Sequence, residues 1–154
     1  MKLRPATLAD AEAILNCLYA AFEPHRQDYS PEGFADTTLT RDTLQQRLSL
    51  MQIVVAGDER NPVIGTISFH LLSPEEGHIR GMAVLPGMHG SGVAAQLLAH
   101  AEASLRSMGA RRATLDTTAP LQRAIRFYEK HGYVASGKIR DFFGMPLFEY
   151  VKQL

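Results

Sequence analysis

The chain has 154 residues, of which 45% are apolar and 21% charged, and its 16 basic and 16 acidic residues cancel. This balance is typical of an ordinary globular protein with one substantial core, and it gives no reason to expect nucleic acid or an anionic membrane as a partner. No apolar run approaches the roughly 18 residues of a membrane span, the first residues lack the apolar centre of a signal peptide, and a single cysteine, Cys17, fits a cytoplasmic location.

The first third of the chain predicts a short strand and two helices separated by an irregular segment. Residues 2–4 are typical of a strand, and Thr7 followed by Asp10 is typical of a helix N-terminus. Residues 24–39 are polar and contain Pro31 and Gly33, so we expect no regular structure there before a second helix at 40–50. The first helix carries an inward stripe beside which Cys17 falls, without a catalytic role; the stripe contains Ile14, Leu15, Leu18, Tyr19 and Phe22.

The remaining elements alternate in a mixed order. Three β-rich runs at 52–56, 63–71 and 78–85 are joined by turns at 58–62 and 74–77. There follow a helix at 91–108, a strand at 113–117, a helix from Pro120 to Gly132, and strands at 133–140 and 147–152. The inward face of the first of these helices is expected to hold Val93, Leu97, Leu98, Ala101, Leu105 and Met108. Without repeats or linkers, residues 1–154 predict one mixed α/β domain rather than a doubly wound sheet.

The most informative segment is the glycine-rich turn that ends at Gly92 and opens the helix at 91–108. Such a turn gathers backbone N–H groups at the positive end of the helix dipole, where they bind phosphate without any lysine. Gly90 and Gly92 allow a ligand to approach the backbone closely because no Cβ intervenes. The turn therefore predicts a site for a phosphate-bearing ligand, and the alternative is a plain structural turn that caps the helix.

Residues 84–94 resemble the acetyl-CoA-binding loop of the GNAT (GCN5-related N-acetyltransferase) superfamily. Gly92 and Ala94 match the end of that signature, whereas His89 stands where Arg or Gln is usual. Most contacts in this loop are made by backbone amides, so the departure at His89 leaves the binding principle intact.

Residues 124–133 resemble the second signature of the same superfamily. The Asn often found before this signature is Leu121 here, so one side-chain contact to the coenzyme is missing. The two signatures stand in the right order and are joined by a helix and a strand of suitable length. The matching residues of the second signature are Ala124, Tyr128, Gly132 and Tyr133.

The resemblance implies both a fold and an activity. The fold is a central, mostly antiparallel sheet of six to seven strands, splayed between strands 4 and 5 and flanked by about four helices. The activity is transfer of an acetyl group from acetyl-CoA to a primary amine, of a small molecule rather than a protein, by direct attack through a tetrahedral intermediate. We expect a monomer or homodimer without a metal, because the six histidines show no ligand spacing.

The resemblance also places the coenzyme. Its pantetheine arm would run along the backbone of Met82, Ala83 and Val84, whose edge can offer an N–H group to the thioester carbonyl. Tyr128 would lie beside the sulfur. The diphosphate would take up the backbone amides of His89, Gly90, Ser91, Gly92, Val93 and Ala94.

The reaction needs a proton acceptor and a proton donor. An alkylamine with a pKa of about 10.4 is neutral in only about one molecule per thousand at pH 7, and deprotonation costs on the order of 4 kcal/mol. The resemblance makes Tyr128 the acid that protonates the departing thiolate, and the alternative is a core position on the apolar face of its helix. The base stays open among His78, Glu75 or Glu76 in the preceding turn, and water in a channel.

Two segments are candidates for the acceptor side. Residues 22–42 carry more acids than bases around Arg26 and Arg41, which predicts a mildly acidic rim for a cationic amine or simply a solvated loop. The residues between the last two strands form a substrate wall, a dimer contact or ordinary packing; they are Arg140, Asp141, Phe142 and Phe143. The acids of the first segment are Glu23, Asp28, Glu32, Asp36 and Asp42.

Two other classes of protein compete with this interpretation. Residues 90–95 also fit the dinucleotide fingerprint Gly-x-Gly-x-x-Ala, and Asp116, 26 residues beyond Gly90, would be the ribose-binding acid of a small NAD-binding protein. Against this stand the four residues between strand and first glycine, and an antiparallel run before the motif that does not fit a βαβ unit. A non-catalytic acyl-CoA-binding domain is the third class, and the presence of Tyr128 argues against it.

Overall fold

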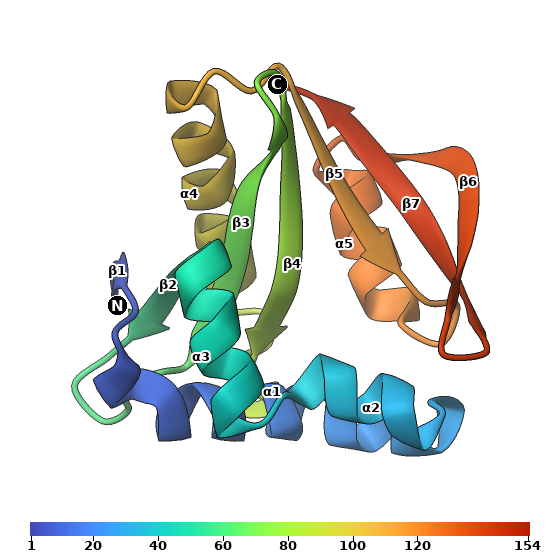
Figure 1. The fold of residues 1–154 in the computed structure, drawn as a ribbon. Coiled ribbons are helices and arrows are strands. Elements are labelled where there is room, and N and C mark those ends of the chain that lie inside the picture. Colours follow the sequence, from blue (N-terminus) through green and yellow to red (C-terminus); the bar gives the residue numbers. More distant parts are fainter.

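A computed structural model describes all residues from Met1 to Leu154 and contains one seven-stranded sheet with the order β1-β2-β3-β4-β5-β7-β6 (Figure 1). Every neighbouring pair of strands is antiparallel except β4 and β5. The mostly antiparallel sheet predicted from the sequence is therefore confirmed. The strands are β1 (Lys2–Pro5), β2 (Gln52–Gly57), β3 (Gly65–Ser73), β4 (Glu76–Val84), β5 (Arg112–Thr117), β6 (Val134–Phe142) and β7 (Met145–Gln153).

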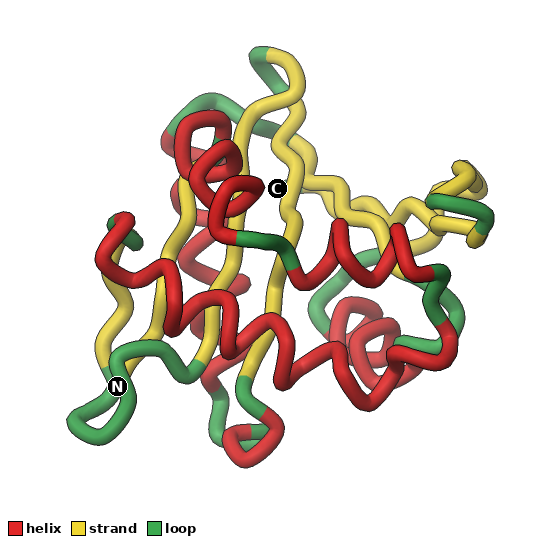
Figure 2. Tube along the Cα trace, turned by 60° about the horizontal axis from the view of Figure 1, so that its bottom comes forward, coloured by secondary structure: helices red, strands yellow, loops and turns green.

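Five α-helices cover the two faces of the sheet, one more than expected. The core residues of α4 and α5 pack on one face and those of α1 and α3 on the other (Figures 1 and 2). Because α4 connects the parallel strands β4 and β5, the glycine-rich turn does belong to a βαβ unit, contrary to the sequence-based expectation. No helix combines the length and apolarity that a bilayer crossing requires. The helices are α1 (Ala11–Phe22), α2 (Pro31–Thr38), α3 (Arg41–Leu50), α4 (Val93–Ser107) and α5 (Gln122–Lys130).

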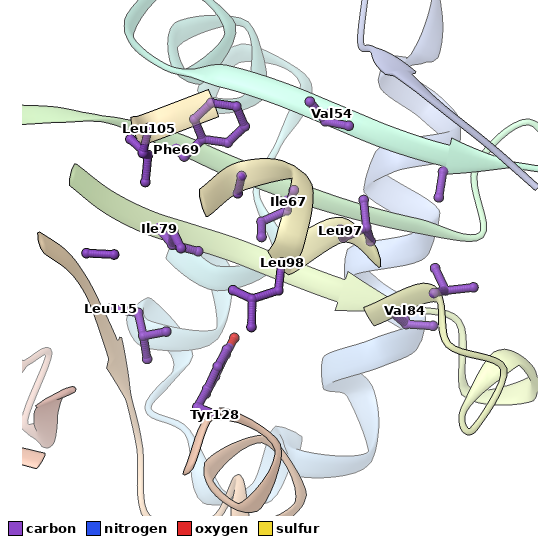
Figure 3. Close-up of a cluster of buried hydrophobic side chains, with 14 of the residues drawn as sticks. Val54, Ile67, Phe69, Ile79, Val84, Leu97, Leu98, Leu105, Leu115 and Tyr128 are labelled. Carbon is purple, nitrogen blue, oxygen red and sulfur yellow. The ribbon is translucent and has the colours of Figure 1, made fainter. Parts of the chain in front are cut away.

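The larger core lies between the sheet and α4 (Figure 3). Leu97, Leu98 and Leu105 of α4 are at most 1% exposed and belong to one buried cluster with Ile67 and Phe69 of β3. Burial of each such side chain contributes about 1.5–3 kcal/mol. Met108, predicted on the same face, is 37% exposed because it is the C-cap residue, where the chain leaves the sheet.

The smaller core lies under α1 and α3. The inward face of α1 is centred on Ile14 and Leu18 as predicted, but Cys17 lies within this face and is 1% exposed. Tyr19 is 45% exposed, and its ring instead meets the edge of Phe34 in α2. The expected stripe was therefore rotated by about one residue, and Cys17 is a core residue.

Helix α2 occupies part of the segment that was expected to be irregular. Ser30 caps it by accepting a hydrogen bond from the Gly33 N–H (3.2 Å), and Pro31 takes the first helical position, where it needs no N–H partner. Gly33 serves close packing, because a Cβ there would lie 3.3 Å from the Phe142 ring. Figure 2 shows the α1–α2 segment crossing the ends of the strands toward the β6–β7 hairpin.

Strands β4 and β5 separate after four paired positions, from Glu76↔Arg112 to Ile79↔Leu115. A bulge inserts one extra residue into β4 between Arg80 and Ala83, and Gly81 adopts φ +63° there. The bulge bends β4, so its edge beyond Ile79 has no strand partner on the β5 side. The predicted splay between strands 4 and 5 is confirmed.

Candidate active site

A cleft of about 930 Å³ opens at the splay between β4 and β5. This volume lies near the upper end of the range for small-molecule sites. Its walls come from the free edge of β4, the first turn of α4, the end of β5, one face of α5, the segment from α1 to α3 and the end of β6. The cleft therefore joins the glycine-rich turn to the segments that were expected on the acceptor side.

The glycine-rich turn presents unpaired backbone donors to one end of this cleft. The N–H groups of Gly90, Gly92, Val93, Ala94 and Ala95 donate to no backbone acceptor in the chain. Gly90 and Gly92 adopt φ +80° and +88°, and a Cβ on either would meet nothing within 4 Å. These amides at the N-terminus of a 15-residue helix fit the diphosphate of a coenzyme.

Two residues of this turn that were predicted to bind the diphosphate, His89 and Ser91, have backbone N–H groups that are already hydrogen-bonded. The His89 N–H donates to the Pro86 carbonyl (3.3 Å), and the Ser91 N–H donates to the Met88 carbonyl (3.3 Å). Ser91 also turns its hydroxyl to the Met88 carbonyl and does not line the cleft. The two amides shape the turn, while the His89 ring lines the cleft near Arg123, a residue that the sequence did not single out.

The free edge of β4 forms the wall next to this turn. Met82, Ala83 and Val84 all line the cleft, and the last two are buried. Since no strand pairs with this side of β4 beyond Ile79, its backbone is available to an extended ligand.

Tyr128 rises from α5 and points its hydroxyl oxygen toward β4 beside Leu98 (Figure 3). The residue is 9% exposed and lines the cleft. Burial alone raises the pKa of Tyr128 to about 12, so its hydroxyl keeps the proton at neutral pH. The two interpretations of Tyr128 made from the sequence are therefore compatible, because its ring packs in the core while its hydroxyl faces the cleft.

His78 lies in the cleft as a neutral side chain. Its Nδ1 is 2.8 Å from the Thr114 hydroxyl, which donates to the Gly77 carbonyl (3.4 Å), so the ring hydrogen is assigned to Nδ1 and Nε2 is free to accept a proton. Burial first, and then the charges of His70, Arg140 and Arg80, lower the pKa of His78 to about 4.

Asp116 is a neighbour of His78 that the sequence had suggested only for the dinucleotide alternative. Its Oδ2 lies 3.7 Å from the His78 Nε2 and is held by Arg140, while its Oδ1 has no hydrogen-bond partner. Burial raises the pKa of the Asp116 carboxyl. Arg140 engages Oδ2, and Oδ1 is buried, so this carboxylate is not free to hold a ribose.

Glu75 and Glu76, the other candidates for a base, do not line the cleft. The carbonyl of Glu75 accepts hydrogen bonds from the N–H groups of Arg111 (2.7 Å) and Arg112 (3.3 Å), which fixes the turn at the start of β5. The Glu75 carboxylate lies 3.6 Å from Arg111 in an exposed ion pair.

The expected acidic rim is wrong. Of the five acids in residues 22–42, only Asp36 lines the cleft, and it forms an ion pair with Arg80 (2.9 Å). Helix α2 turns Glu32 to solvent, so acids counted along the sequence do not gather in space. The charged side chains around the cleft are Arg47, Arg80, Arg123, Lys130 and Arg140 against Asp36, Asp116 and Asp141.

The β6–β7 hairpin forms part of the far wall. Arg140, Asp141 and Phe142 line the cleft, and Phe142 approaches α2 near Gly33. Phe143, at φ +51° in the turn, is 48% exposed and lies outside the cleft. Three of the four residues considered for a substrate wall thus line the cleft.

Arg47 of α3 is a cleft residue that the sequence did not single out, and it is only 8% exposed. It lies three residues after Leu44 on the inward face of its helix, so a charged residue at an inward helical position was the available signal.

Comparison with known proteins adds three findings. The family model of the acetyltransferase (GNAT) family matches residues 12–133. The aminoalkylphosphonate N-acetyltransferase of Salmonella typhimurium is 32% identical over 142 residues, covering 88% of this chain and 86% of the relative. A GCN5-related N-acetyltransferase from Rhodopseudomonas palustris has a similar structure, with a TM-score of 0.79, 25% identity and coverage of 99% and 95% of the two chains.

A more distant structure shares the fold alone. The PaiA N-acetyltransferase of Thermoplasma acidophilum, solved in complex with coenzyme A, superposes with a TM-score of 0.81 at 16% identity, covering 99% of this chain and 98% of that one.

Proposed function

The chain belongs to the GNAT acetyltransferase family, and from this premise we propose that it transfers an acetyl group from acetyl-CoA to the primary amine of a small molecule. One observation carries the proposal: a single cleft joins the unpaired amides at Gly90 and Gly92, the hydroxyl of Tyr128 and the ring of His78. The name of the relative from Salmonella, an aminoalkylphosphonate N-acetyltransferase, supports a small amine as the acceptor.

The coenzyme takes the end of the cleft that is built from backbone. The unpaired amides of the glycine-rich turn bind its diphosphate, and the free edge of β4 at Met82–Val84 aligns the pantetheine arm. A backbone N–H on that edge is positioned to stabilise negative charge on the thioester oxygen. A Cβ added to Gly90 or Gly92 would meet no atom within 4 Å, so the space beside these two glycines is open to a ligand, which supports this arrangement.

In the reaction, the amine nitrogen attacks the thioester carbonyl carbon, and a tetrahedral intermediate then breaks its carbon–sulfur bond. A carbon–nitrogen bond forms, the nitrogen loses a proton, and the sulfur leaves as a thiolate that gains one. The chain therefore has to remove one proton and supply another at two places in the cleft.

Tyr128 supplies the proton to sulfur. Its phenol stays protonated because burial raises its pKa to about 12. The same desolvation raises the pKa of a thiol that leaves into this environment, so the gap between the pKa values of donor and acceptor stays small. A hydrogen bond from the phenol also stabilises the thiolate before the proton moves.

His78 receives the proton from nitrogen through its free Nε2. The ring is neutral at pH 7 since its pKa lies at about 4, so it needs no prior deprotonation. A base of this strength holds the proton only briefly, and Asp116, 3.7 Å away, is the next acceptor on the way to solvent.

The test is release of the coenzyme thiol with acetyl-CoA and a panel of amines, with the acetylated product identified by mass. Calorimetry with CoA and with NAD runs in parallel. CoA binding with amine-dependent thiol release supports the proposal. Binding of NAD in place of CoA would establish the dinucleotide alternative, and CoA binding without turnover of any amine would establish a non-catalytic binding domain.

A further inference from the structure

Arg47 is a mostly buried cation at the wall of the cleft. It is 8% exposed, no hydrogen bond or ion pair holds its guanidinium, and burial and then the charge of Arg80 lower its pKa to about 10. The guanidinium is still charged at neutral pH. Removing a charge from water without giving it a partner is unfavourable, so a guanidinium held in this way favours the binding of an anion.

The bulge in β4 leaves space for the Arg47 side chain at the cleft. A Cβ on Gly81 would lie 2.5 Å from the Arg47 Nη1, so the guanidinium lies directly against the β4 bulge and would have to move if a side chain stood there. The bulge thus places the Arg47 guanidinium at the free edge of β4, three positions beyond His78.

A second cation and several hydrogen-bond donors accompany Arg47. Arg80 pairs with Asp36 at 2.9 Å, and the charges of both residues act on Arg47, so two guanidinium groups share one carboxylate and the local charge is positive. His70 on β3 also lines the cleft, and burial together with Arg80 lowers its pKa, which leaves a neutral ring with one N–H donor. These groups are suited to an oxyanion rather than to an ammonium group.

We propose that the acceptor end of the cleft is an anion-binding site in which Arg47 and Arg80 bind a phosphonate or a similar oxyanion carried by the acceptor, a short chain away from its amine. This inference rests on the proposed function. Strand geometry puts Gly81 about 10 Å from His78 along β4, and an arginine side chain covers part of that distance. The anion then anchors the acceptor while the amine reaches His78.

The first test compares acceptors of equal chain length in the acetyl-transfer assay. The panel is 2-aminoethylphosphonate, taurine, β-alanine, ethanolamine, propylamine and 1,3-diaminopropane. We expect kcat/KM to be at least about 100-fold higher for the best anionic acceptor than for any neutral or cationic one, and the ranking among the three anions identifies the headgroup. Equal use of neutral amines or diamines would overturn the inference and leave the proposed function standing.

The second test replaces Arg47 with methionine, which keeps the length and packing of the stem. We expect Arg47→Met to raise KM for the best anionic acceptor about 100-fold, to leave KM for acetyl-CoA unchanged, and to raise the midpoint of thermal unfolding because an unpaired charge leaves the interior. Arg41→Met is the matched control, since Arg41 is exposed on the same helix and does not line the cleft. A structural role for Arg47 would instead lower the unfolding midpoint without changing acceptor preference, which contradicts the inference.

A binding measurement keeps the inference testable if turnover is absent. Calorimetric titration of 2-aminoethylphosphonate into the CoA-saturated protein should give heat with the native chain and with Arg41→Met, and none with Arg47→Met. Absence of binding to all three proteins would overturn the anion site, whereas failure to bind CoA would overturn the proposed function.

Discussion

At one end of the cleft, the turn around Gly90 and Gly92 offers backbone N–H groups and almost no side chains. At the other end, Arg47 of α3 and His78 and Arg80 of β4 offer charged and titratable side chains. The first kind of site depends on chain conformation, so it survives most changes of sequence. The second kind changes with a single substitution, which explains physically how one scaffold serves many acceptors.

The largest expected effect lies between the two ends, at Tyr128. Tyr128→Phe removes the hydroxyl while keeping the ring in the core, so we expect kcat to fall about 100-fold or more with little change in either KM. Steady-state kinetics with both substrates measures this. Tyr19→Phe is the control, because Tyr19 is exposed and outside the cleft. An unchanged kcat in Tyr128→Phe would remove Tyr128 from the mechanism.

A substitution in the backbone-built end should act on the coenzyme alone. Gly92→Val forces a branched side chain into φ +88° and costs about 2 kcal/mol in the turn, so we expect KM for acetyl-CoA to rise about 30-fold and KM for the acceptor to stay unchanged. Gly87→Ala is the control, since Gly87 has an ordinary φ and open space around it. An equal rise in both KM values would show that the two ends are not separate.

The side-chain end should in turn set the response of stability to acid. The pKa of His78 is about 4 in the folded chain and near 6.5 when unfolded, so the unfolded state binds the proton first as pH falls. The neutral ring therefore contributes stability that is complete above pH 6.5 and is lost as pH falls toward 4. We expect the free energy of unfolding to drop by about 2 kcal/mol between pH 7 and pH 5 from this group.

Chemical denaturation of the native chain and of His78→Asn at both pH values checks this difference. The groups around His78 are His70 on β3, Arg80 on β4, Thr114 and Asp116 on β5, Arg140 on β6 and Glu149 on β7. The variant should lose most of the acid-induced drop, and an identical drop in both proteins would assign it to other groups.

The smallest expected effect tests the contribution of the net charge at the acceptor end. Asp36→Asn removes the carboxylate that occupies Arg80, so we expect KM for an anionic acceptor to fall about threefold and KM for a neutral amine to stay constant. The same assay panel measures both. A higher KM for the anionic acceptor would mean that Asp36 positions Arg80 rather than competing for it.

The two ends also differ in what the sequence revealed. The glycine-rich turn and Tyr128 were identified because each belongs to a short local motif: a turn before a helix, and the second family signature at residues 124–133. Arg47 escaped because its place depends on α3 packing against a bulge 34 positions further along the chain. The acidic rim failed for the same reason, since Pro31 and Gly33 were interpreted as breakers and the helix that orients Glu32 and Asp36 was missed.

The extra residue at Gly81 links the two ends of the cleft. Side chains alternate between the faces of a strand, so excising this residue would invert the phase of the β4 segment that follows it. Ala83 and Val84 would exchange faces of the sheet, and the space beside Gly81 that holds the Arg47 guanidinium would be lost. In the proposed function, coenzyme alignment and acceptor binding therefore depend on the same register of β4. Substitutions can change the preferred acceptor, whereas insertions or deletions in β4 would disrupt both functions.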